Sequence, residues 1–71
     1  MVDSEAHDDL RATADDIIAD AEELKAIEQS KLEQHPASAV MAELSADAEE
    51  VSQRIAIKVG IEKQLADSLI P

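Results

Sequence analysis

The chain of 71 residues contains no cysteine, phenylalanine, tyrosine or tryptophan. Without cysteine it has neither a disulfide nor a thiolate metal site. Without aromatic side chains it has no residue that stacks on a nucleic-acid base, anchors a binding pocket or sits at a membrane interface. Glycine occurs once and proline twice, so few residues interrupt a helix.

Long apolar runs and basic clusters are also missing. No apolar stretch approaches the roughly 18 residues of a membrane-spanning helix, and the acidic start lacks the basic and apolar regions of a signal peptide. Six lysines and arginines stand against 17 aspartates and glutamates, which gives a net charge of −11. Such a charge repels nucleic acid and anionic membranes. We therefore expect a cytoplasmic protein with no nucleic-acid and no membrane partner.

Pro36 divides the chain into two nearly equal halves. Proline ends a helix before it and suits the first turn of a helix after it. The sequence thus predicts one helix over about 4–34, a turn over about 34–36 and a second helix over about 37–69, all in a single domain of residues 1–71. Asp3 or Ser4 is the expected N-cap. Two features remain open: a kink or break near 44–46, and Gly60 as either a close helix contact or a local break.

Apolar residues in both halves recur at alternating steps of three and four, which is the 3.5-residue repeat of a coiled-coil seam. In the first half they are Leu10, Ala14, Ile17, Ala21, Leu24 and then Ile27 or Glu28. In the second half they are Ala37, Met41, Leu44, Ala48, Val51, Ile55, Lys58 or Val59, Glu62, Leu65 and Leu69. This pattern predicts an all-α fold, an antiparallel two-helix hairpin.

A short turn brings residues whose numbers sum to about 71 side by side. The bases Arg54, Lys58 and Lys63 then lie level with Ile17, Thr13 and Asp8, beside the acid-rich first half. The charge pattern therefore favours the antiparallel arrangement, although each exposed pair contributes well under about 1 kcal/mol.

A single hairpin has little apolar surface to bury, because 13 of the residues counted as hydrophobic are alanine. A second apolar strip, made of Ala39, Ala46, Ile57 and Ile61, lies away from the seam. Both features favour self-association, most simply as a dimeric four-helix bundle. The residues expected to carry it are Leu10, Ile17, Leu24, Leu44, Val51, Ile55, Ile57, Ile61 and Leu65.

Two carboxylates, Glu28 and Glu62, interrupt the predicted seams. Two hairpins packed with their turns at opposite ends would bring Glu28 of one near Glu62 and His7 of the other, which makes these three residues candidate metal ligands. The chain resembles half-bundle ferritin-like proteins in shape alone. Their Glu-x-x-His motif is absent, since the corresponding stretches read Glu62-Lys63-Gln64-Leu65 and Glu28-Gln29-Ser30-Lys31. The alternative is a purely structural role, in which both glutamates lie at the rim of the bundle or set the register of the helices.

The sequence contains no catalytic triad, no glycine-rich phosphate loop and no zinc pattern. We expect His35 to serve at a helix end rather than in chemistry. The predicted function is that of a non-enzymatic scaffold, adaptor or regulator, without a cofactor, whose partner is itself or another protein. Two alternatives remain: a carboxylate metal-binding bundle, and an acidic antagonist of a nucleic-acid-binding protein.

Overall fold

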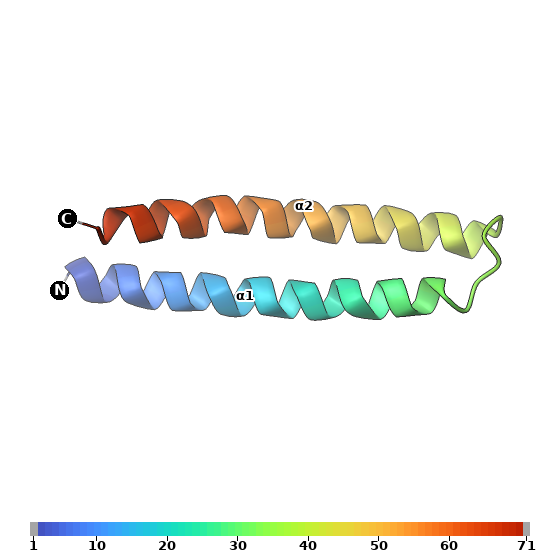
Figure 1. Cartoon of the computed structure of the whole chain (residues 1–71), viewed down its shortest axis with the longest axis horizontal. Helices are drawn as coiled ribbons and strands as arrows, with labels where there is room; N and C mark the ends of the chain where they lie inside the picture. The colour runs from blue at the N-terminus through green and yellow to red at the C-terminus, as the bar shows by residue number, and fades with distance from the viewer. Residues whose placement is uncertain (1, 71) are drawn as a thin grey trace.

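The computed structural model is a hairpin of two long helices that lie side by side (Figure 1). It describes the backbone of residues 2–70 and the side chains of residues 5–70. Helix α1 spans Val2–Lys31 and helix α2 spans Ala39–Ser68. The helices run antiparallel, so both ends of the chain lie at the same end of a molecule that measures 52 × 14 × 12 Å between Cα atoms. The predicted helical hairpin is confirmed.

Helix α1 begins and ends earlier than the sequence predicts. Its backbone is already helical at Val2, so the N-cap expected at Asp3 or Ser4 is wrong. It ends at Lys31 instead of about residue 34, because the next three amides bond to carbonyls only three residues back, at 3.1–3.2 Å. Such bonds tighten a helix end. The connection is therefore 32–38, long enough to cross the 8–10 Å that typically separates two packed helix axes.

The connection is built around a turn over His35–Ser38. The Ser38 amide donates to the His35 carbonyl at 3.0 Å, and the Ala37 amide donates to Nδ1 of His35 at 3.1 Å. Pro36 occupies the second position of this turn, where its fixed φ is suitable. Ser38 then caps α2, because its hydroxyl oxygen accepts from the Met41 amide at 3.0 Å. Helix α2 therefore begins at Ala39, two residues after the predicted start at about residue 37.

Helix α2 continues without a break through both positions at which the sequence left an interruption open. Residues 44–46 and Gly60 all have helical backbone. A Cβ placed on Gly60 would meet nothing within 4 Å, so this glycine marks neither a close approach of α1 nor a local break. Neither reading of Gly60 holds, and α2 has no break at 44–46.

Gly60→Ala should therefore stabilise the protein. An alanine in an exposed helix interior is more stable than glycine by about 0.5–1 kcal/mol, because the unfolded chain loses less backbone entropy on folding. For a domain of this size, the melting temperature followed by circular dichroism should rise by roughly 2–8 °C. Ala56→Gly, an exposed position one turn earlier, should lower it by a similar amount. A drop in melting temperature for Gly60→Ala would show that this position is covered.

The side chains between the helices form a thin core. Within residues 5–70, Ala48 and Val51 are the only buried apolar residues, at 6% and 3% exposure. The other seam positions are half-buried, because two helices cover only one side of each other. In α1 the partly buried or buried positions step by three and four through Leu10, Thr13, Ile17, Asp20, Leu24, Ile27 and Lys31. In α2 they step likewise through Met41, Leu44, Ala48, Val51, Ile55, Lys58, Glu62, Leu65 and Leu69.

The α2 seam follows Lys58 rather than Val59, and two residues of the α1 seam differ from the prediction, because Thr13 stands in place of Ala14 and Asp20 in place of Ala21. Ala21 is exposed and Asp20 takes its place in the seam. Asp20 lies three residues after Ile17 and Ala21 lies four after it, and both steps fit the repeat. Spacing alone therefore does not choose between Asp20 and Ala21. The choice is made across the interface, where cations of α2 hold the Asp20 carboxylate. Ala37, the first predicted seam position of α2, lies in the connection and is exposed.

Candidate functional site

A cluster of four charged side chains links the two helices near their middle. Lys58 donates from Nζ to Oδ2 of Asp20 at 2.7 Å, and the Asp20 side chain is only 11% exposed. Arg54 donates from Nη2 to Glu23 at 2.7 Å and lies 3.8 Å from the other oxygen of Asp20. A buried carboxylate needs such partners, because an unpaired charge away from water is costly. This cluster fixes which stretch of α1 faces Arg54 and Lys58.

The pairing is offset from the one that the sequence predicts. Arg54 and Lys58 were expected level with Ile17 and Thr13, yet they meet Glu23 and Asp20. Helical side chains lean toward the N-terminus of their own helix, and in α2 that end is the connection. Long cationic side chains therefore reach partners nearer the turn than their backbone position implies.

Lys63, the third base of α2, does not reach α1. It pairs with Asp67 one turn along its own helix at 2.7 Å, instead of lying beside Asp8.

These ion pairs divide the hairpin into two unlike faces. Successive residues of an α-helix are rotated by about 100° about its axis. Once Arg54 and Glu23 are known to lie on one side of the seam, this rotation gives the side on which every other helical residue lies. We call the side of this cluster the charged face. Among the side chains that the structure describes, it carries Glu5, Asp9, Asp16, Asp20, Glu23, Glu43, Asp47, Glu50, Arg54 and Lys58. The exposed aliphatic residues Val40, Ile57 and Ile61 lie on the same side of α2.

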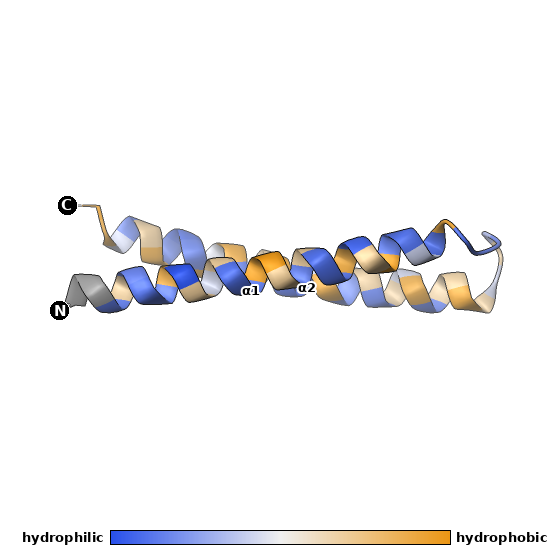
Figure 2. Ribbon diagram, turned by 90° about the horizontal axis from the view of Figure 1, so that it is seen from below, coloured by the Kyte–Doolittle hydropathy of each residue, from blue (hydrophilic) through white to orange (hydrophobic). Residues whose placement is uncertain are grey.

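The opposite side, which we call the apolar face, holds small and aliphatic side chains from both helices. They are Leu10, Ala14, Ile18, Ala21, Met41, Ser45, Ser52, Val59 and Ala66. Two of them are far from covered: Ile18 is 56% exposed and Val59 46%. Figure 2 shows apolar segments that recur along both ribbons between polar ones. This face is the candidate functional site, because it presents apolar surface that the hairpin itself does not bury.

The residues predicted to carry self-association fall into two groups. Val51 is buried, and the half-buried members lie in the seam within one hairpin: Leu10, Ile17, Leu24, Leu44, Ile55 and Leu65. Ile57 and Ile61 are 66% and 46% exposed and lie outside the seam, as do Ala39 and Ala46. No second chain is present, so their part in self-association stays a prediction.

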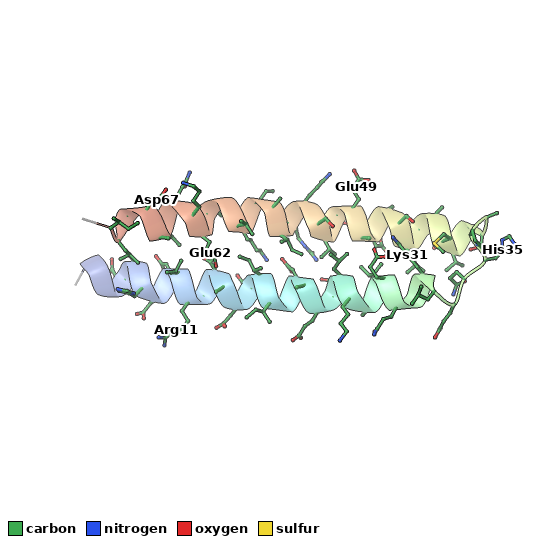
Figure 3. All side chains as sticks on the ribbon, viewed as in Figure 1. Arg11, Lys31, His35, Glu49, Glu62 and Asp67 are labelled. Carbon is green, nitrogen blue, oxygen red and sulfur yellow. The ribbon has the colours of Figure 1, made fainter. Side chains whose placement is uncertain are left out.

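The candidate metal ligands lie apart in the hairpin. Glu28 is exposed and pairs with Lys31 at 3.0 Å, so the prediction that it interrupts the seam is wrong. Glu62 is half-buried between the helices, as Figure 3 shows, whereas Arg11, Glu49 and Asp67 point outward. His7 is exposed. Among the described residues, no group of three or more histidines and carboxylates is placed to hold a metal ion.

Asp20 is the residue that sequence reasoning missed. The available signal was its position three residues after Ile17, opposite the only two bases near the middle of the second half. Residues 5–70 enclose no pocket. Neither helix of the described chain combines the length and the hydropathy that crossing a bilayer requires. Comparison with protein families, with curated proteins and with solved structures finds no match to this chain.

Proposed function

We propose that this protein is a non-enzymatic scaffold, adaptor or regulator in the cytoplasm that acts through helix–helix association, first with itself, as a four-helix bundle. The observation that supports this is the amount of surface left uncovered. The hairpin exposes 5286 Å², whereas a compact monomer of the same mass exposes about 4,300 Å². A second layer of helices is the simplest way for the apolar part of this excess to be removed from water.

The thin core supports the same proposal. Helices in proteins derive most of their stability from packing of an apolar face rather than from intrinsic propensity. Here each helix packs against only one other, and two buried apolar residues, Ala48 and Val51, form the whole dry centre of the described chain. Packing a second hairpin on the first gives each helix two neighbours and covers the half-buried seam residues from the open side.

Size-exclusion chromatography with light scattering tests the proposal, with refractive-index detection because the chain has no tryptophan or tyrosine. At tens of micromolar, the measured mass should be about twice the 7.6 kDa of the chain. The melting temperature should also rise with protein concentration, because association stabilises only the folded state. A cooperatively folded monomer whose melting temperature does not depend on concentration would contradict the proposal.

A further inference from the structure

We infer that a second copy of this chain docks on the apolar face, so that both charged faces lie on the outside of the resulting four-helix bundle. This inference rests on the proposed self-association and names the surface that performs it. Three properties of the face support it: its charge, its area and the sizes of its side chains.

The distribution of charge over the chain favours this face for the approach of two copies. The charged face carries eight acids against two bases. The charged side chains on the same side of the seam as the apolar residues nearly balance one another, with two acids and three bases: Arg11, Lys25, Glu28, Glu49 and Lys63. Two chains of net charge −11 that met through their charged faces would bring like charges together at short range. Contact through the apolar face keeps the acids apart and in water.

One flat side of the hairpin is large enough for a stable dimer. The hairpin is 52 Å long, and two helices side by side are roughly 20 Å wide. One flat side therefore offers about 1,000 Å² per copy, or roughly 2,000 Å² in the complex, above the 1,200 Å² at which specific interfaces begin. A single added helix from another protein would cover about half of this.

The sizes of the side chains suit a second hairpin of the same kind. Ala14, Ala21 and Ala66 alternate on the apolar face with Ile18 and Val59. Small residues between larger ones let helices approach closely while the larger side chains fill the gaps. A two-fold dimer presents the same patch twice, so one face that is nearly balanced in charge and mixed in side-chain size satisfies both copies. A fold with so thin a core needs a partner that is always available, and a second copy is present whenever the chain is made.

The strip of Ile57 and Ile61 is the competing surface, and its surroundings disfavour it. Glu43, Glu50 and Ile57 follow one another at seven-residue intervals and so lie on one stripe of α2. Docking two copies through Ile57 would therefore bring both pairs of glutamates toward each other. On this inference, Ile57 and Ile61 stay exposed in the dimer.

Two variants with equal exposure separate these surfaces. Val59 and Ile61 are both 46% exposed, both lie on α2 and both are β-branched, but they lie on opposite sides of the seam. Replacing either with glutamine removes apolar area without adding charge to the acidic chain. Val59→Gln should raise the dissociation constant of the dimer on the order of 100-fold, because each of the two copies loses the burial of one valine side chain at the interface. Ile61→Gln should change it less than threefold. Concentration-dependent light scattering and sedimentation measure both.

A second measurement covers the case in which Val59→Gln does not fold. Ser52 lies in the middle of the apolar face and its neighbour Gln53 on the far side of α2, and both are exposed in the hairpin. The chain has no cysteine, so Ser52→Cys and Gln53→Cys each carry one thiol. At concentrations where the dimer forms, alkylation of Ser52→Cys should be at least tenfold slower than that of Gln53→Cys, and the two rates should converge on dilution.

Each outcome has a separate meaning. Equal effects of the two glutamine variants, a larger effect of Ile61→Gln, or equal alkylation rates in the dimer would overturn the apolar face as the interface and leave self-association standing. A wild-type chain that is monomeric at all concentrations would overturn both the interface and the proposed function.

Discussion

Val51→Asp should unfold the hairpin. Val51 is the most buried apolar residue of the described chain, at 3% exposure, and lies between the two helices. The substitution removes its apolar burial and places a carboxylate in the seam without a cation of its own, which together cost about 3 kcal/mol or more. For a domain of this size, that loss lowers the melting temperature by at least roughly 12 °C. Circular dichroism at 222 nm at micromolar concentration measures the loss of helix.

Val40→Asp is the matched control. It makes the same change at a valine that is 46% exposed in the first turn of α2. A carboxylate there lies near the positive end of the helix dipole, which favours it. Val40→Asp should therefore melt within about 3 °C of the wild-type protein. Equal melting temperatures for Val51→Asp and the wild type would mean that the two helices do not pack through Val51.

Asp20→Lys should produce the second large loss of stability. Asp20 is 8% exposed as a residue and holds Lys58 at 2.7 Å, with Arg54 at 3.8 Å. A lysine at position 20 replaces two attractions with two repulsions at a poorly solvated position. Breaking a buried ion pair typically costs about 3–5 kcal/mol. Urea or thermal unfolding followed by circular dichroism should show a loss in that range, even though the net charge of the chain becomes less negative.

A reciprocal exchange separates the ion pair from burial alone. The double variant Asp20→Lys, Lys58→Asp restores opposite charges at the same two positions and should recover more than half of the lost stability. Asp16→Lys is the control, since Asp16 is exposed on the same face and the change in net charge is identical. It should be neutral or slightly stabilising. Failure of the double variant to recover any stability would show that the charge pairing does not fix the register of the helices.

The fold class could be derived from the sequence because the relevant physics is local. The three-and-four spacing of Leu10, Ile17, Leu24, Leu44 and Val51 defines an apolar stripe on each helix without reference to any other part of the chain. Proline at position 36 excludes a continuous helix for the same kind of reason. Two helices and a short connection between them then leave an antiparallel hairpin as the simplest arrangement.

The candidate site depended on information that no single helix contains. Spacing alone does not choose between Asp20 and Ala21 as the seam residue, and the cations at positions 54 and 58 decide it across the interface. Likewise, the apolar face consists of residues from two helices, so neither half of the sequence displays it. Its position opposite the acids becomes visible only once the Arg54–Glu23 pair shows on which side of the seam each helix places its charges.

The sequence by itself determined the elements of this protein: two amphipathic helices, their antiparallel order and an excess of acid. The tertiary structure decided the connection over 32–38, the burial of Asp20 and the separation of an apolar face from a charged one. This division between sequence and tertiary structure follows from the distance along the chain over which each interaction acts. Helical periodicity and proline sterics act within a few residues, whereas ion pairing and shared faces depend on the rotation of each helix about its axis, which only packing against the other helix sets.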